Sequence, residues 1–289
     1  MKIDIITTND EFENIKEEWD DLLVRSGGNI FQTWEWQWTW WKHYSKGKRL
    51  FILIGREGGV VGIAPFYLSK SHFGLPVKVL SFLGTGPSDY GGIIVLPKRK
   101  EEFIKRALSY ISSFSNAWDI IDMQQLPENS SCTRFPEGLF KEDGFRYLKL
   151  FQDSLPALLL PSTWDEFISR LSKKFRYNLG YYSKSIRKAH EVDIYSLSEG
   201  IKDISCEMNI FFDLHQKRWR AKKLPGLFWS KRYRDFHLDV ADRFCKKGWL
   251  ALYFLKLDGE VAASLYGFKY NNCFYKKISV EYHPALLGG

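Results

Sequence analysis

The chain has 289 residues, of which 45% are hydrophobic and 17% aromatic, and its formal net charge is +8. This apolar content argues against an intrinsically disordered chain, and the length suits two domains of roughly 100–200 residues each. No apolar run approaches the roughly 18 residues of a membrane span, and the N-terminal stretch is acidic where a signal peptide would be apolar, so we expect a cytoplasmic protein.

The distribution of charge and the spacing of the cysteines further restrict the expected partners and sites. Residues 1–152 carry 19 basic and 19 acidic side chains, whereas residues 153–289 carry 23 and 15, so the whole basic excess lies in the second half. An anionic partner is therefore expected to meet that half. The cysteines are few, widely spaced and without a CxxC pair, so neither a disulfide nor a metal site is expected.

Strand-like and helix-like runs alternate through the first half. A hairpin signal stands out where residues 57–59, Glu-Gly-Gly, join two apolar runs. The expected elements, in chain order, are a strand at 2–6, helices at 10–23 and 34–44, strands at 50–56, 60–68, 77–83 and 93–96, a helix at 101–114, a strand at 118–124, a helix at 131–143 and a strand at 145–150.

The second half repeats this order. The expected elements are a helix at 164–188, a strand at 192–196, helices at 201–222 and 231–247, and strands at 249–257, 261–270 and 273–280. The hairpin signal also recurs, because EGGV leads into GIAPFY in the first half and DGEV leads into AASLYGF in the second. Such self-similarity predicts two copies of one α/β fold, with domains at residues 1–152 and 153–289.

Two aromatic or basic stretches have more than one interpretation. FQTWEWQWTWWKHY, at residues 31–44, places tryptophans along one helical face, which fits a buried helix or a platform for stacking sugars. RLSKKFRYNLGYYSKSIRKAH, at residues 170–190, has seven basic residues and no acidic one. Its basic face fits a solvated surface, a specific anionic ligand, a membrane surface or nucleic acid.

Two further stretches carry candidate site residues. The loop GTGPSDYGG, at residues 84–92, presents Asp89 and Tyr90 to a ligand or forms a structural turn, and it lacks the lysine of a phosphate-binding loop. His215 and Trp219 are four residues apart on an expected helix. His215 is either a general base or a structural histidine.

Taken in order, seven stretches resemble one family. They are FQTWEWQWTWW, REGGVVGIAPFYL, FLGTGPSDYGGIIV, WDIIDMQQLP, LSKKFRYNL, LHQKRWRAK with PGLF, and GWLALYFLKLDGEVAASLYGFKY. Together they resemble the CelD-type, BioF2-like acetyltransferase domain of bacterial polysaccharide-biosynthesis proteins, which is a GNAT acyltransferase similar to the Fem aminoacyltransferases. The resemblance extends over nearly the whole chain from about residue 29.

The resemblance implies tandem GNAT-like domains with mixed central sheets flanked by helices. It also implies transfer of an acyl group from acetyl-CoA or another acyl-CoA to an amine, with an amino sugar, a nucleotide-linked sugar or another anionic molecule as acceptor. No metal takes part in that chemistry. Surface-polysaccharide biosynthesis is the implied process.

The same resemblance places the site residues. The expected strand 273–280 is the fourth strand of a GNAT domain, and the acyl-donor loop follows it, with Leu287, Gly288 and Gly289 as donor-binding residues. The second domain is then incomplete after its fourth strand. At the end of that strand, Glu281 is the candidate base and Tyr282 its candidate catalytic neighbour.

The acceptor residues come from both halves. The stretch LSKKFRYN matches the helix that binds the acceptor in Fem relatives, which gives Arg176 and Asn178 that role, with Asp89 and Tyr90 facing them from the first domain. His215 and Trp219 are assigned to the acceptor as well.

Three rival functions stay open. One is a Fem-like transferase that uses aminoacyl-tRNA as donor. A second is a module that binds anions or nucleic acid through residues 170–190 without catalysis, and a third is a non-catalytic scaffold. The acceptor, the acyl group and the oligomeric state are not fixed by the sequence.

Overall fold

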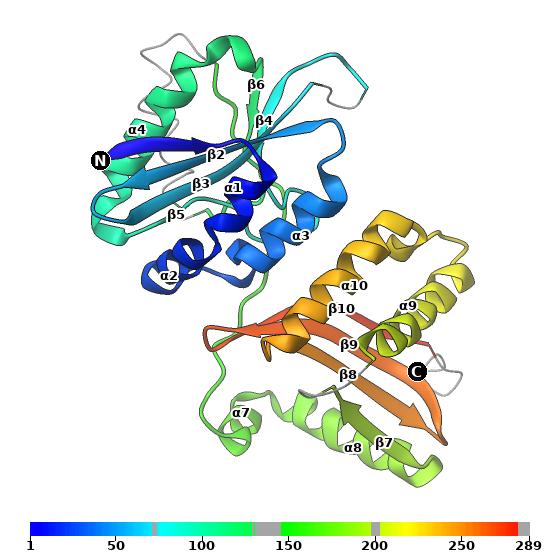
Figure 1. Ribbon diagram of the computed structural model, residues 1–289. Coiled ribbons are helices and arrows are strands. Elements are labelled where there is room, and N and C mark those ends of the chain that lie inside the picture. The colour runs from blue at the N-terminus through cyan, green and yellow to red at the C-terminus, as the bar shows by residue number, and fades with distance from the viewer. Residues whose placement is uncertain (71–73, 129, 131–145, 198–202, 283–289) are drawn as a thin grey trace. The chain divides into compact units, whose positions relative to one another are not determined.

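The computed structural model describes residues 1–70, 74–128, 130, 146–197 and 203–282 (Figure 1). The chain divides into two compact units, each with a β-sheet and helices. Unit 1 comprises Met1–Gln152, Asp235–Phe244 and Lys269–Cys273, and unit 2 comprises Asp153–Arg234, Cys245–Phe268 and Phe274–Gly289. The expected α/β class is confirmed, whereas the expected domain limits at residues 152 and 153 stay a prediction.

Unit 1 is built on a six-stranded mixed sheet. Its central strands run in the order β1-β2-β3-β4-β6, and β5 pairs with β3. All pairs are antiparallel except β4 with β6, which is parallel. The strands are β1 (Lys2–Ile6), β2 (Lys48–Arg56), β3 (Val60–Ser69), β4 (Val79–Phe82), β5 (Ile94–Val95) and β6 (Ile120–Asp122).

Helices cover both faces of this sheet, which explains why β2 and β3 are apolar on both sides. Alternate residues, among them Leu53 and Phe66, pack in one core cluster with Phe103 and Leu108. The helices of unit 1 that precede residue 152 are α1 (Asn9–Asn14), α2 (Lys16–Ser26), α3 (Trp34–Tyr44) and α4 (Lys100–Ser113), with 3-10 turns at Ile30–Gln32, Pro97–Arg99 and Ser115–Ala117.

The tryptophan-rich stretch forms α3, and its tryptophans are buried, which confirms the interpretation as a core helix. Two of their indole N–H groups anchor the following glycine-rich loop. Trp36 donates to the hydroxyl of Ser88 (2.8 Å), and Trp40 donates to the carbonyl of Thr85 (3.2 Å). Gly84 has φ +84°, and a Cβ there would lie 2.5 Å from the Ser88 hydroxyl, so the loop requires glycine.

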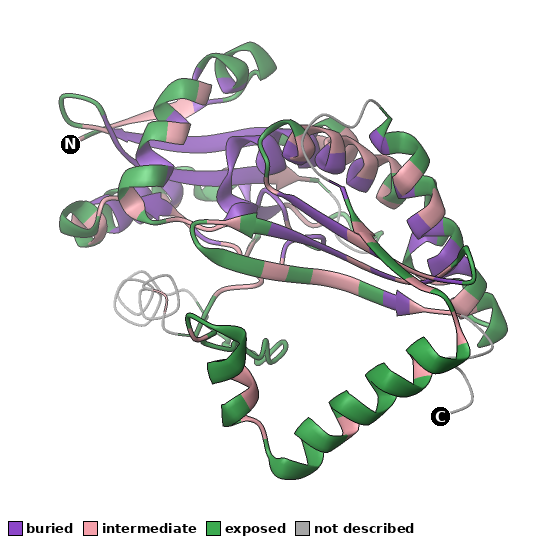
Figure 2. Ribbon diagram, turned by 90° about the horizontal axis from the view of Figure 1, so that it is seen from below, coloured by how far each residue is buried: buried purple, intermediate pink, exposed green. Residues whose placement is uncertain are grey.

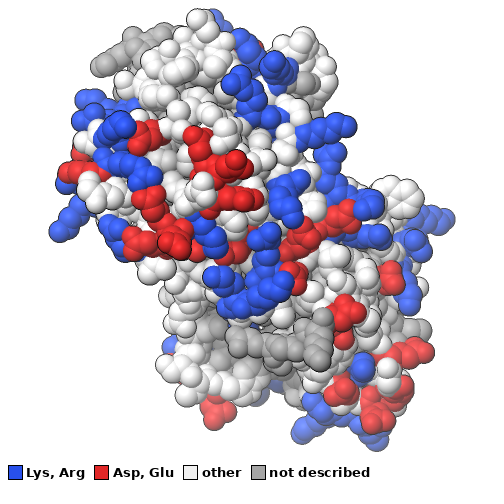
Figure 3. All heavy atoms as spheres, viewed as in Figure 1, with Lys and Arg blue, Asp and Glu red and all other residues white. Residues whose placement is uncertain are grey.

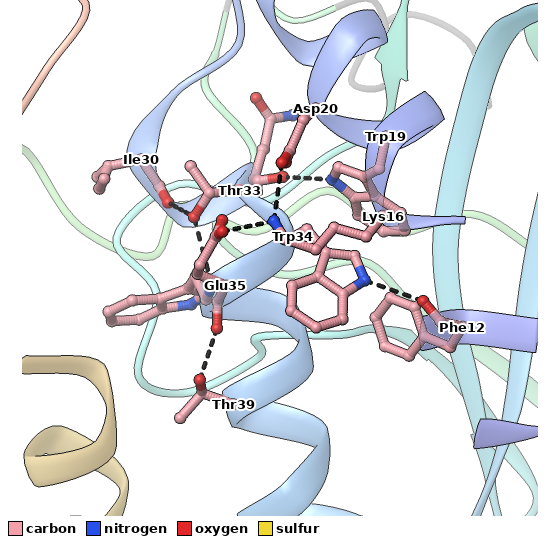
Figure 4. Close-up of polar contacts among 11 residues, drawn as sticks. Phe12, Lys16, Trp19, Asp20, Ile30, Thr33, Trp34, Glu35 and Thr39 are labelled. Carbon is pink, nitrogen blue, oxygen red and sulfur yellow. Dashed lines mark hydrogen bonds and ion pairs between the residues drawn. The ribbon is translucent and has the colours of Figure 1, made fainter. Parts of the chain in front are cut away.

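A buried ion pair joins α2 to α3 (Figure 4). The ammonium of Lys16 contacts Asp20 (2.7 Å) and Glu35 (2.5 Å), and it lies 4.6 Å from the centre of the Trp34 ring. Partial burial lowers the pKa of Lys16, but the hydrogen bonds and charges of both carboxylates raise it overall. Lys16 therefore stays charged, and it neutralises a carboxylate that is almost fully buried.

On the surface of unit 1, acidic and basic side chains are interspersed (Figure 3). Arg56 pairs with Glu18 at 2.6 Å, and Arg99 pairs with Glu57 at 2.6 Å. This pairing accompanies the zero net charge of residues 1–152. Exposed pairs of this kind are worth about 1 kcal/mol or less.

Unit 2 holds a four-stranded sheet in the order β10-β9-β8-β7, in which β7–β8 and β8–β9 are antiparallel. Phe211 and Phe212 of α9 are buried, and Phe211 lies against Tyr266 of β9, with ring centres 5.3 Å apart. The strands are β7 (Val192–Ser196), β8 (Leu250–Leu257), β9 (Glu260–Tyr270) and β10 (Cys273–Glu281). The helices are α7 (Trp164–Arg170), α8 (Lys173–Ala189) and α9 (Ile204–Ala221), with a 3-10 turn at Leu227–Trp229. Helix α10 (Lys231–Lys246) begins in unit 2, and its residues Asp235–Phe244 belong to unit 1.

Helix α8 carries the basic stretch, and most of it is exposed (Figure 2). Its aromatic residues, including Phe175 and Tyr177, are more than half exposed. The guanidinium of Arg176 donates to the carbonyls of Ser169 (2.9 Å) and Leu171 (2.7 Å). It therefore ties the start of α8 to the end of α7.

Several expected elements differ from the structure. The helix expected at 10–23 is two helices that meet at Ile15, and the helix expected at 164–188 is interrupted by extended backbone at Leu171. Ser172 caps α8 after the second interruption, whereas α2 begins after Ile15 without a side-chain cap. Residues 146–150 form no strand. The helix expected at 131–143 lies outside the described residues.

No helix among the described residues combines the length and the apolar character that crossing a bilayer requires.

Candidate active-site cleft

Helix α9 presents one row of polar side chains from unit 2. The helix starts at an N-cap where Asp203 accepts from the N–H of Cys206 (3.1 Å). His215, Trp219 and Lys222 follow at intervals of four and three residues, and Arg218 lies beside them. Side chains at this spacing share one helical face, so the end of α9 gathers a histidine, an indole and two cations.

The loop after α9 folds back over the helix. Gly226 has φ +69°, and a Cβ there would lie 2.9 Å from both Gln216 and Trp219. With its amide in the orientation that satisfies both groups, Gln216 donates to the Pro225 carbonyl (2.8 Å) and accepts from the N–H of Trp229 (3.1 Å). These contacts hold the loop in one place against Trp219.

Phe228 anchors the same loop in the core. Its ring is 1% exposed and lies 4.5 Å from the ring of Phe212 and 4.8 Å from that of His215, edge to face with the latter. Burial of an aromatic ring of this size contributes about 2–3 kcal/mol. The wall that the loop forms beside α9 is thus fixed by packing.

Strand β10 forms the opposite wall. Within the described part of the sheet β10 has one neighbour, β9, so it lies at an edge. Val280 is buried, and the N–H of Tyr282 donates to the carbonyl of Ala262 (2.9 Å), which continues the pairing past the end of β10. The polar side chains of β10 are therefore held by a paired backbone.

Between α9 and β10 lies a cleft of about 290 Å³. We call it the basic cleft, because four of its lining residues are cations. It is lined by His215, Arg218, Trp219, Lys222, Leu227, Lys276, Lys277, Ile278, Ser279 and Val280.

One carboxylate reaches the basic cleft. The Glu281 carboxylate pairs with the guanidinium of Arg218 at 2.7 Å. Both side chains keep partial access to solvent. The pair joins the candidate base Glu281 to Arg218, which lines the cleft, although the sequence separates the two residues widely.

His215 is the most buried polar group of the basic cleft, with 3% of its surface exposed. Burial, aided by the nearby charge of Arg218, lowers the pKa of His215 to about 4. At neutral pH the imidazole is therefore uncharged. Its Nδ1 has no hydrogen-bond partner among the described residues.

The structure brings together only some of the predicted site residues. His215 and Trp219 line the basic cleft, Glu281 is joined to it through Arg218, and Tyr282 follows at the end of β10. The remaining predictions lie elsewhere or are not described. Asp89 and Tyr90 belong to unit 1, Arg176 and Asn178 belong to α8, and Leu287, Gly288 and Gly289 lie outside the described residues.

Four cations of the basic cleft were not predicted. Arg218 and Lys222 could have been found, because they share the helical face of His215. Lys276 and Lys277 gave no such signal, since two adjacent lysines in a strand point to opposite faces and usually meet solvent. Both lysines line the basic cleft because β10 lies at the edge of the described sheet.

Among the described residues, no group of three or more histidine, cysteine, aspartate or glutamate side chains could hold a metal ion.

Comparison with protein families gives one match in unit 2. Residues 173–287 match the model described as an acetyltransferase (GNAT) domain. This region contains α8, α9, α10 and all of the unit 2 sheet, and therefore the whole basic cleft. A comparison with curated proteins finds no match.

Comparison with solved structures finds likenesses at low identity. A conserved protein of unknown function from Bacteroides thetaiotaomicron matches with a TM-score of 0.50 and 10% identity, over 97% of this chain and 80% of that chain. L-PGS from Bacillus licheniformis has a TM-score of 0.49 and 14% identity, over 93% and 66%. A tandem GNAT protein from the clavulanic acid biosynthesis pathway has a TM-score of 0.42 and 12% identity, over 99% and 82%. Of these, the Bacteroides protein supports the fold, and at 10% identity it supports the fold alone.

Proposed function

We propose that the chain is an N-acyltransferase of the GNAT type, which transfers an acyl group from acyl-CoA to an amine. The observation that carries the proposal is the family match over residues 173–287, the region that contains the basic cleft and Glu281. The CelD-type resemblance of the sequence suggests an amino sugar as acceptor and surface-polysaccharide biosynthesis as the process. Two tandem GNAT-like domains, 1–152 and 153–289, are part of the same proposal.

The reaction needs an uncharged amine and a place for its proton. In the proposed step the amine nitrogen forms a bond to the thioester carbonyl carbon, the carbon–sulfur bond breaks, and the thiolate leaves and is protonated. The acyl-CoA supplies the activated carbonyl. Glu281, whose carboxylate contacts the Arg218 guanidinium at 2.7 Å, accepts the proton that the amine loses.

The fit of acyl-CoA rests on two features of this chain. Strand β10 lies at an edge of the described sheet, where an extended amide-containing arm can align along its backbone. The cations of the basic cleft suit an anion. Tyr282 is the proposed catalytic neighbour of Glu281, and Leu287, Gly288 and Gly289 are the proposed donor loop.

Release of free thiol tests the proposal. The purified chain is mixed with acetyl-CoA and with amino sugars such as glucosamine, and thiol is followed with a disulfide dye. We expect acceptor-dependent thiol release that falls at least about 100-fold in Glu281→Gln, in line with the loss of a general base. Glu260→Gln, at the exposed start of β9, is the matched control and keeps full activity. Thiol release that no amine stimulates would refute the proposal.

A second candidate is transfer from aminoacyl-tRNA, as in Fem enzymes. It is favoured by α8, a helix of seventeen residues that includes several basic side chains and exposed tyrosines on which bases can stack. Release of labelled amino acid from charged tRNA, with no thiol from acyl-CoA, would select this function.

A further inference from the structure

The basic cleft concentrates one sign of charge. Arg218 and Lys222 come from α9, and Lys276 and Lys277 come from β10, while the Glu281 carboxylate contacts this group through Arg218. Four cations on two elements repel one another at short range. An anion with more than one charge would relieve this repulsion.

His215 adds a second, independent observation. Its side chain is almost completely buried, it lines the basic cleft, and its Nδ1 has no hydrogen-bond partner among the described residues. A buried polar atom without a partner is uncommon in native proteins and points to a ligand atom or an ordered water. A neutral imidazole can donate to an oxygen acceptor or accept from a hydroxyl group.

The remaining wall of the basic cleft is apolar and suits a ring. Trp219 and Leu227 face the cleft, and the ammonium of Lys222 lies 5.7 Å from the centre of the Trp219 ring. The loop that supports them is fixed through Gly226 and Phe228. Sugar rings stack on indoles through their C–H faces, so the wall suits a sugar beside the cations.

The volume sets an upper limit on the ligand. Pockets for drug-sized molecules measure about 300–1,000 Å³. The basic cleft, at about 290 Å³, lies at the small end of this range. It accommodates a group of the size of one phosphorylated sugar.

We propose that the basic cleft binds the phosphoryl group of a phosphorylated sugar, held by Arg218, Lys222 and Lys276 with the sugar ring against Trp219. Arg218 then changes partner, from Glu281 to the phosphate. A phosphate accepts bidentate, charge-assisted hydrogen bonds from a guanidinium, which makes this exchange favourable. The exchange also releases the Glu281 carboxylate, so binding and proton acceptance are coupled. This inference rests on the proposed function in naming the acceptor class.

Binding measurements test the inference without any catalysis. Glucosamine 6-phosphate and glucosamine are titrated separately into the full chain and followed by calorimetry. We expect the phosphorylated sugar to bind at least about tenfold more tightly. The double variant Lys222→Gln/Lys276→Gln should lose this preference, whereas Lys184→Gln/Lys188→Gln on α8, with the same change in charge, should retain it.

Two outcomes overturn the inference. One is equal affinity for the two sugars. The other is an equal loss in both double variants, which would mean that the general charge of unit 2 attracts the phosphate. Thermal melting of each variant confirms that the fold is intact.

The phosphate of the donor is the other possible source, and competition separates the two. Coenzyme A, whose phosphates carry the same chemistry, is added to the chain saturated with glucosamine 6-phosphate. Simultaneous binding supports an acceptor site, and displacement overturns it. If the phosphorylated sugar binds but no amine stimulates thiol release, the proposed function fails while the binding site stands. If glucosamine alone supports thiol release and no phosphate preference exists, the function stands and the inference fails.

Discussion

His215 links the chemistry of the basic cleft to the stability of the fold. Burial lowers the pKa of this imidazole from the ordinary value of 6.5 to about 4 in the folded chain. Between these two pH values the unfolded chain binds a proton that the folded chain does not. Stability is therefore complete above about pH 6.5 and falls as the pH drops toward 4.

The size of this effect follows from the shift. Each pKa unit corresponds to about 1.4 kcal/mol, so protonation of His215 removes up to about 3 kcal/mol. At pH 5 the loss is about 2 kcal/mol, because the folded pKa is not yet reached. We predict that urea unfolding at pH 8 and at pH 5 shows this difference in the wild type, and that His215→Gln shows a smaller one. Equal pH dependence in the two proteins would mean that other groups carry it.

Disruption of the Lys16–Glu35 ion pair should also lower the free energy of unfolding. Glu35 is 4% exposed, and Lys16 supplies its positive partner. Lys16→Met leaves a buried carboxylate without that cation, which we expect to cost about 3 kcal/mol of unfolding free energy. Denaturant titration measures it.

Lys2→Met is the matched control. Lys2 also pairs with a carboxylate, that of Asp4 at 2.7 Å, but it is 80% exposed. Its loss should cost less than about 1 kcal/mol. Equal costs at both positions would show that burial does not strengthen the Lys16 pair.

For single residues, the sequence predicted which side chains share a helical face better than it predicted which side chains of different elements meet. Trp219 and His215 were found because helical spacing is readable over one turn. Lys276 escaped because its meeting with α9 depends on which edge β10 occupies, and that is a property of the sheet. The ion pair of Arg218 with Glu281 escaped for the same reason.

Among the elements, the hairpin of β2 and β3 depends on two glycines. A Cβ at Gly62 would lie 2.6 Å from the ring of Phe103, and one at Gly55 would also lie 2.6 Å from it. The phenylalanine of α4 therefore sits directly on the backbone of the sheet. Close packing of this kind leaves little space for another methyl group.

We predict that Gly62→Ala destabilises the chain by about 1–3 kcal/mol through overpacking against Phe103. Gly59→Ala is the control, because a Cβ at Gly59 would meet no atom within 4 Å. Thermal unfolding of the two variants checks this. A stable Gly62→Ala would mean that the ring of Phe103 moves aside without cost.

The sequence predicted the type of each helix or strand more accurately than its first and last residues. The helices at α3 and α4 and the paired strands β2–β3 and β8–β9 have strong periodic or turn signals, and they occur where expected. The interruption at Leu171 escaped because the apolar spacing continues across it. It is stabilised by Arg176 and by the Ser172 cap, which are contacts between side chains and backbone.

For the whole molecule, the segment that precedes α7 is its most accessible described backbone. Residues 146–161 have no regular secondary structure, and Phe151 and Leu159 are 84% and 91% exposed. Proteases cleave exposed, irregular backbone first. We predict that brief chymotrypsin treatment cuts here, and that mass spectrometry finds two fragments, one that ends and one that begins within residues 146–161. A first cut inside the β2–β3 hairpin would contradict this.

The α/β class of the whole chain was predictable, because both halves repeat one order of elements. The domain limits at residues 152 and 153 stay a prediction, and the compact unit 1 also includes Asp235–Phe244 and Lys269–Cys273. Such assignments depend on contacts across the chain, which no local pattern encodes.

The burial of the tryptophans has an optical consequence. All seven in unit 1 are buried, including the stacked pair Trp34 and Trp38, whereas Trp164 and Trp229 of unit 2 are 65% and 72% exposed. Buried indoles emit at shorter wavelengths than hydrated ones. Tryptophan emission at shorter wavelengths therefore reports on unit 1, and quenching of the fluorescence by iodide reports on unit 2. Fluorescence of one unlabelled sample thus distinguishes the two units.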